Sequence, residues 1–135
     1  MKRVIAMILT TVMLLSLSAC SMLSEENVKL RDLDFTVLSE EKIPQELCTI
    51  IEEKEGGPFK LTYSDKEFLY ICIGYGEQAT GGYSIAVNEL YLTNNAIYVN
   101  TELLGPDASE KGNKVPSYPY IVIKTEYLDE TVIFQ

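Results

Sequence analysis

The apolar positions of residues 43–54 repeat with the spacing of an α-helix. Residues three or four apart lie on one helix face, so a single stripe would carry Ile43, Leu47, Ile50 and Ile51. Pro44 suits the first helical turn, and Gly56 with Gly57 after the segment is typical of a helix end. The pattern predicts one amphipathic helix over residues 44–54, with its stripe buried against the rest of the fold.

From residue 59 onward, apolar and polar residues alternate with the period of β-strands. Residues 68–73 are apolar on both faces, as expected for a central strand. Asn94 and Asn95 predict a tight hairpin turn, because asparagine tolerates positive φ. In that hairpin the facing pairs would be Leu92 with Ile97 and Leu90 with Val99. A change of parity predicts a β-bulge near residues 88–89. Further strands are predicted at residues 33–37, 59–63, 83–92, 118–125 and 131–135.

These elements predict the fold class α+β. We expect a mainly antiparallel sheet of about six to seven strands, with one amphipathic helix packed on it. Residues 33–135 have the length of one ordinary domain and would bury a core without extra covalent links.

The N-terminal residues have the pattern of a bacterial lipoprotein signal. Lys2 and Arg3 precede an apolar run over residues 4–17, and Ser18 and Ala19 lead into Cys20. The run is shorter than the roughly twenty residues that a transmembrane helix needs. By resemblance to lipoproteins, residues 1–19 are a cleaved signal, Cys20 carries the lipid, and residues 20–32 form a tether. The expected location is the extracytoplasmic face of the cell membrane. An uncleaved anchor, and a plain signal with a chance cysteine, are the alternatives.

The net charge and the amino-acid composition exclude several classes of function. The chain has a net charge of −9, and without residues 1–19 it would have 9 basic and 20 acidic residues, or −11. Such a surface repels phosphate backbones, so we expect no nucleic-acid partner. Histidine is absent, which excludes Ser-His-Asp and Cys-His catalytic groups and the usual catalytic zinc sites. We therefore expect that the protein is not an enzyme and that it binds no metal ion and no cofactor.

Two cysteines remain once Cys20 is assigned to lipid. Cys48 and Cys72 would lie in an oxidising compartment, where a disulfide between them is one interpretation. Two separate buried thiols are the other, since free cysteine is often buried. No histidine is present to activate either as a nucleophile.

Three short segments rich in glycine, proline and tyrosine are the candidate partner-binding residues. They comprise Thr80, Gly81, Gly82 and Tyr83; Gly105 and Pro106; and Tyr118, Pro119 and Tyr120. Glycine allows positive φ and the close approach of another chain, and tyrosine is enriched in contact surfaces. If these loops gather at one end of the sheet, they form a small surface together with Tyr75. The alternative interpretation is that the glycines only shape a turn and the tyrosines cover the core.

The order of these segments resembles the C-terminal domain of the PrcB family. The resemblance is carried by residues 80–85 (TGGYSI), the glycine-proline loop and residues 118–124 (YPYIVIK), within residues 68–125. That family is named for a subunit of a bacterial surface protease complex, and its members are often lipoproteins. The resemblance implies an accessory role rather than catalysis.

A second, weaker analogy is to chagasin-type inhibitors of cysteine proteases, which place three such loops in a protease cleft. This chain departs from that pattern by an extra glycine before Tyr83 and by its lack of tryptophan.

The sequence thus predicts a non-catalytic cell-surface lipoprotein that binds a partner protein. The expected role is an accessory or assembly subunit of an extracellular protease complex, and the alternative is a protease inhibitor that uses the residue 80–83 loop. Adjacent acids such as Glu52 and Glu53 do not face each other as a catalytic pair would.

Overall fold

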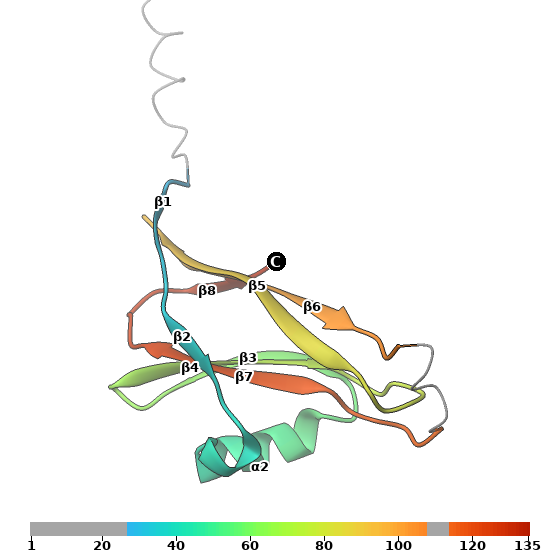
Figure 1. Cartoon of the computed structure of the whole chain (residues 1–135). Coiled ribbons are helices and arrows are strands. Elements are labelled where there is room, and N and C mark those ends of the chain that lie inside the picture. Colours follow the sequence, from blue (N-terminus) through green and yellow to red (C-terminus); the bar gives the residue numbers. More distant parts are fainter. Residues whose placement is uncertain (1–26, 108–113) are drawn as a thin grey trace, which may run out of the picture.

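The computed structural model describes residues 27–107 and 114–135, whose strands form two facing sheets (Figure 1). The first sheet has the strand order β1-β5-β6-β8, and the second has the order β2-β7-β4-β3. Neighbouring strands are antiparallel except β6 and β8, which are parallel. The strands are β1 (Lys29–Asp32), β2 (Phe35–Val37), β3 (Pro58–Ser64), β4 (Phe68–Tyr75), β5 (Ser84–Thr93), β6 (Ile97–Leu104), β7 (Tyr120–Glu126) and β8 (Val132–Phe134). A 3₁₀ turn, η2 (Glu40–Lys42), precedes the helix α2 (Gln45–Lys54).

The helix covers the face of the second sheet that is turned away from the first, so the fold has three layers (Figure 1). The central strand β4 serves both interfaces because its side chains alternate. Leu69, Ile71 and Ile73 belong to the core between the sheets. Tyr70 and Cys72 pack with Leu47 and Ile51 of α2 in a second core.

The predicted fold class is confirmed, and the strands differ from the prediction in number and in layering. Eight strands form two sheets instead of one. The physical reason lies in the central strands β4 and β7, which are apolar on both faces and need cover on both. One ten-residue helix covers only one of these faces, and the first sheet covers the other.

The first strand corrects the predicted tether over residues 20–32. Residues 29–32 form β1 and pair with β5, while the strand predicted at 33–37 begins at Phe35. Residues 29–32 show no apolar alternation because all four are exposed, and the backbone pairing with β5 holds this strand in place. Lys29 pairs with Asp32 at 2.7 Å, and Arg31 pairs with Glu126 of β7 at 2.6 Å.

The β5–β6 hairpin has the predicted register. Leu90 lies opposite Val99 and Leu92 lies opposite Ile97, and the register shifts between Val87 and Glu89 as the predicted bulge requires.

The predicted cause of that hairpin turn is wrong. Lys66 is the non-glycine residue with positive φ in the described part of the chain, so neither Asn94 nor Asn95 has one. The turn is closed by the Thr93 N–H, which donates to the Ala96 carbonyl at 2.8 Å, and the Thr93 hydroxyl accepts hydrogen bonds from the backbone N–H groups of Asn95 and Ala96.

The predicted helix is confirmed to within one residue, and three of its four stripe residues are buried. Ile43, Leu47 and Ile51 are in the core, whereas Ile50 is only half-buried. Cys48 and Cys72 form no disulfide. Both are free thiols packed in the helix-side core, which agrees with the alternative interpretation of two separate thiols.

Native Cys72 is expected to resist alkylation. Burial raises the pKa of its thiol to about 12 from 9.0, so only about 0.1 % is thiolate at pH 9. Maleimide labelling at pH 9, followed by mass spectrometry of each cysteine peptide, should show Cys72 reacting at least a hundredfold more slowly in the native than in the denatured protein. The half-buried Cys48 is the internal comparison. Equal rates for Cys72 in both states would contradict its burial.

The same pKa difference predicts a loss of stability at alkaline pH. The unfolded thiol releases its proton near its ordinary pKa of 9.0, whereas the native thiol keeps it up to about 12. Below pH 9, the protonated Cys72 thiol therefore makes its full contribution to the free energy of unfolding. That contribution declines as the pH rises from 9 towards 12. In Cys72→Ala this part of the decline should be absent.

The predicted signal over residues 1–19 and the lipid-bearing Cys20 lie outside the described residues. Within the described ranges, no helix has the length and apolar character needed to cross a membrane.

Candidate protein-binding site

Three segments meet at one end of the two sheets, and we call this region the loop end. They are residues 76–83 after β4, residues 105–107 after β6, and residues 117–119 before β7. Their meeting follows from strand pairing. Ser84 at the start of β5 lies opposite Leu104 at the end of β6, and Gly74 of β4 lies opposite Tyr120 of β7.

The first segment leaves the second sheet at a position that requires glycine. Gly76 has a φ of +76°, and a Cβ there would lie 3.0 Å from the backbone nitrogen of Pro58. An L side chain would therefore be both strained and crowded. This turn directs the chain away from β3 and towards the first sheet.

A two-bond bridge ties the first segment to the third. The Gln78 N–H donates to the Ser117 carbonyl at 2.8 Å, and the Ser117 N–H donates back to the Gln78 carbonyl at 3.0 Å. The Ser117 hydroxyl also donates to the Thr80 carbonyl at 2.6 Å. Pro119 accepts from the Tyr75 N–H at 3.0 Å. The first and third segments are therefore held in a fixed arrangement by hydrogen bonds, most of them between backbone groups.

The glycine pair offers backbone with little side-chain cover. A Cβ at Gly81 would have no atom within 4 Å, and Gly82 is exposed with a φ of +86°. The predicted positive φ thus applies to Gly82 and not to Gly81. The Thr80 hydroxyl donates to the Gly81 carbonyl at 3.2 Å. The space beside Gly81 is open to contact by another chain.

The remaining loop-end residues differ in their exposure. Tyr83 is half-buried, and its ring lies 3.6 Å from the position that a Cβ on Gly105 would take. Gly105 is exposed, Pro106 is half-buried, and Tyr118 is 41 % exposed. The exposed carboxylates of Glu77 and Asp107 lie in the same segments. The surface offers backbone groups and tyrosine rings in an acidic setting.

Two tyrosines expected at this surface are placed elsewhere. The Tyr75 hydroxyl shares a 2.6 Å hydrogen bond with Thr101 between the sheets. Tyr120 lies on the helix side of the second sheet, where its hydroxyl donates to Glu40 at 3.4 Å. Burial, followed by the Glu40 charge, raises the pKa of Tyr120 to about 12. The alternation of side chains along β4 and β7 decides both placements.

The sequence interpretation missed the Gln78–Ser117 bridge. The two residues are far apart in the chain, and neither belongs to a recognisable motif. The open edge of β2 was also missed, because residues 33–37 alternate in the way a half-buried strand does. In the described ranges, no three His, Cys, Asp or Glu side chains come close enough to hold a metal ion.

Comparison with known families agrees with the sequence resemblance. Residues 69–126 match the family model described as PrcB C-terminal, a range that includes all three loop-end segments. Neither the comparison with curated proteins nor that with solved structures gives a match. The matched range begins in β4 and ends with β7.

Proposed function

We propose that this chain, with its PrcB C-terminal segment, is a non-catalytic lipoprotein that binds a partner protein through the loop end. The proposed location is the extracytoplasmic face of the membrane, with the chain held by lipid on Cys20. The proposed role is an accessory or assembly subunit of an extracellular protease complex. This role extends the family resemblance, and the match itself covers only the domain.

One observation carries the proposal. The Gln78–Ser117 bridge holds the first and third loop-end segments together, and beside it Gly82 is exposed and the space at Gly81 is open. A fixed surface of backbone groups and tyrosine suits protein contact, because little conformational entropy is lost on binding. Catalysis is not part of the proposal, since the chain has no histidine and the Cys72 thiol is held protonated by burial.

The test is capture of partners with Gly81→Trp. The position faces open space and has an ordinary backbone conformation, so the large side chain should block contact without disturbing the fold. Gly82 is less suitable, because any side chain there is strained by its positive φ. Tagged protein would be captured from detergent-solubilised membranes of the producing cells and read by mass spectrometry. We expect the partner to be depleted at least tenfold by Gly81→Trp, a loss of about 1.4 kcal/mol or more.

The matched control is Glu130→Trp, an exposed position beyond the far end of β7 from the loop end. Both variants should melt at the same temperature as the unmodified protein. A partner that is retained by Gly81→Trp, or lost equally with both variants, would contradict the proposal. If the captured partner is a protease, adding soluble domain to it separates the two roles, since an inhibitor lowers its activity in proportion to dose.

A further inference from the structure

The strand β2 ends the second sheet with an open edge. Leu38, directly after β2, donates its N–H to the Val122 carbonyl of β7 at 2.9 Å. Antiparallel pairing alternates the direction of the backbone groups, so Thr36 also faces β7. The N–H and C=O groups of Phe35 and Val37 therefore point outward, and no strand of the described residues lies on that side.

This edge lacks the protection found on the opposite edge of the same sheet. The edge strand β3 begins with Pro58, which has no N–H, and carries Lys60, whose ammonium lies 5.8 Å from the centre of the Phe134 ring. Such residues prevent the addition of another strand. In contrast, β2 contains no proline and no charge, and its Phe35 and Val37 side chains are 41 % and 51 % exposed.

The sequence of β2 allows it to pair with β2 of a second copy of the chain. In an antiparallel pairing of two copies centred on Thr36, Phe35 lies opposite Val37 of the second copy. Because those residues carry the outward backbone groups, each Phe35–Val37 pair exchanges two hydrogen bonds, and symmetry gives two such pairs. The same pairing covers the exposed apolar side chains and places the two Thr36 side chains side by side, a favourable cross-strand pair.

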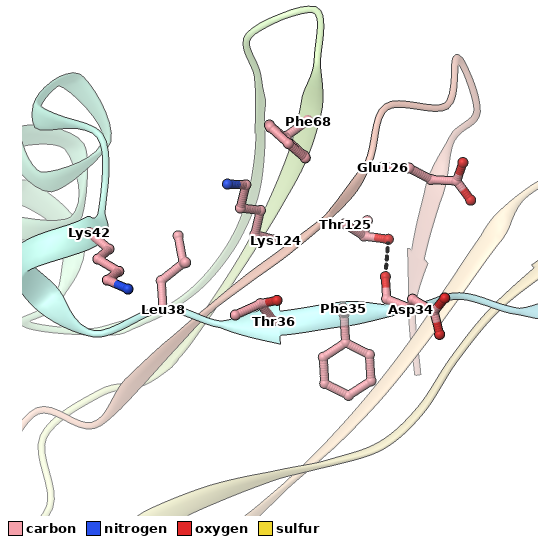
Figure 2. A pocket seen from close by; sticks show the side chains of 9 residues that line it. All are labelled: Asp34, Phe35, Thr36, Leu38, Lys42, Phe68, Lys124, Thr125 and Glu126. Carbon is pink, nitrogen blue, oxygen red and sulfur yellow. Dashed lines mark hydrogen bonds between the residues drawn. The ribbon is translucent and has the colours of Figure 1, made fainter.

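Charge complementarity supports the same pairing. Asp34 of one copy comes opposite Leu38 of the other, on the helix side of the sheet. Leu38 lines a groove of about 370 Å³ together with Lys42 and Lys124, and Figure 2 shows the Lys42 ammonium beside Leu38. Among the described residues, the ion pairs are Lys29 with Asp32 and Arg31 with Glu126, so neither lysine of the groove has a carboxylate partner. The Lys124 ammonium lies over the Phe68 ring at 3.9 Å from its centre, which leaves Lys42 as the cation beside Leu38. Asp34 of the second copy would supply one.

We propose that this protein forms a two-fold dimer in which β2 of one copy pairs antiparallel with β2 of the other. The two second sheets join into one continuous eight-stranded sheet, with both helices on the same face. Asp34 of the second copy then enters the groove in Figure 2 where Leu38 and Lys42 lie. This surface is separate from the loop end, so either proposal stands if the other fails.

Thr36→Cys in the full chain, in its membrane, tests the pairing. Directly opposite residues that do not exchange backbone hydrogen bonds have the Cβ separation that a disulfide needs. We expect a reducible band of twice the chain mass on a non-reducing gel after mild oxidation. The unmodified chain controls for its own cysteines. Ile133→Cys controls for random contact, because it lies on the other uncharged edge strand, β8, with a similarly exposed side chain.

Second-site changes in the Thr36→Cys chain show whether the cross-link depends on this interface. Val37→Pro removes an outward N–H, and Val37→Lys adds a charge at an exposed site without changing the backbone; each should lower the cross-linked fraction at least tenfold. Asp34→Lys and Lys42→Asp should each lower it, and the two together should restore it. A missing cross-link, an equal one from Ile133→Cys, or one unaffected by both Val37 variants would overturn the dimer.

Discussion

Replacing Ile71 with alanine is expected to destabilise the protein by about 3 kcal/mol. Ile71 is fully buried at the centre of β4, in the core enclosed between the two sheets. The loss combines the transfer free energy of the deleted methyl and methylene groups with the cavity that the strands cannot close. Because a whole domain is stable by only about 5–15 kcal/mol, this is a large share of the total.

The matched control is Ile133→Ala on β8. The Ile133 side chain is 38 % exposed, so the same deletion there should cost less than about 1 kcal/mol. Urea unfolding followed by far-ultraviolet circular dichroism gives both values, and the nine tyrosines provide a second signal in a chain without tryptophan. If both variants lose the same free energy, Ile71 is not enclosed by two sheets.

Gly74→Ala is expected to cost about 1–3 kcal/mol, although it adds only one methyl group. Gly74 on β4 lies opposite Phe59 on β3. A Cβ on Gly74 would lie 2.5 Å from Cδ1 and 2.9 Å from Cζ of the Phe59 ring, closer than atoms can pack. The glycine therefore lets the ring lie across the backbone of β4, and a methyl group would displace it from the helix-side core.

A double-mutant cycle separates this crowding from the intrinsic effect of replacing glycine. Phe59→Leu alone should destabilise the protein, but in the Gly74→Ala background it should cost less, because the smaller side chain leaves room for the methyl group. Gly56→Ala is the control, since a Cβ there meets no atom within 4 Å, and its effect should stay within about 0.5 kcal/mol. A Gly74→Ala variant as stable as Gly56→Ala would show that the ring moves without cost.

Strong local periodicity explains which elements could be predicted. The stripe containing Leu47 and Ile51 predicts α2, and the doubly apolar β4 is recognisable because both of its faces are buried. The register of the β5–β6 hairpin follows from a two-residue turn between matched apolar runs. In each case, residues near one another in the chain carry the whole signal.

Elements stabilised by distant partners could not be predicted. Residues 29–32 lack an apolar pattern, and β1 forms because its backbone pairs with the edge that β5 offers. The parallel pairing of β8 with β6 likewise depends on where β7 ends, because β8 follows β7 directly in the chain. This is why a single sheet was expected where two are found.

The candidate site shows the same division. Gly81, Gly82 and Tyr118 could be identified as candidates from the sequence because glycine and tyrosine are typical of contact surfaces. Strand pairing brings their segments together. It also included Tyr75 and Tyr120, but side-chain alternation turns these two into the cores. The hydrogen bonds between Gln78 and Ser117, which hold the loop end, join positions that share no local pattern.

The sequence by itself determined the fold class, the helix, the central strand and the hairpin register, because hydrophobic periodicity acts over a few residues. Only the tertiary structure decided the division into two sheets, the side on which each tyrosine lies, and the open edge at Phe35 and Val37. Those features depend on which strands compete for the same neighbour. That competition is settled by the packing of the whole chain and leaves no mark in any one segment.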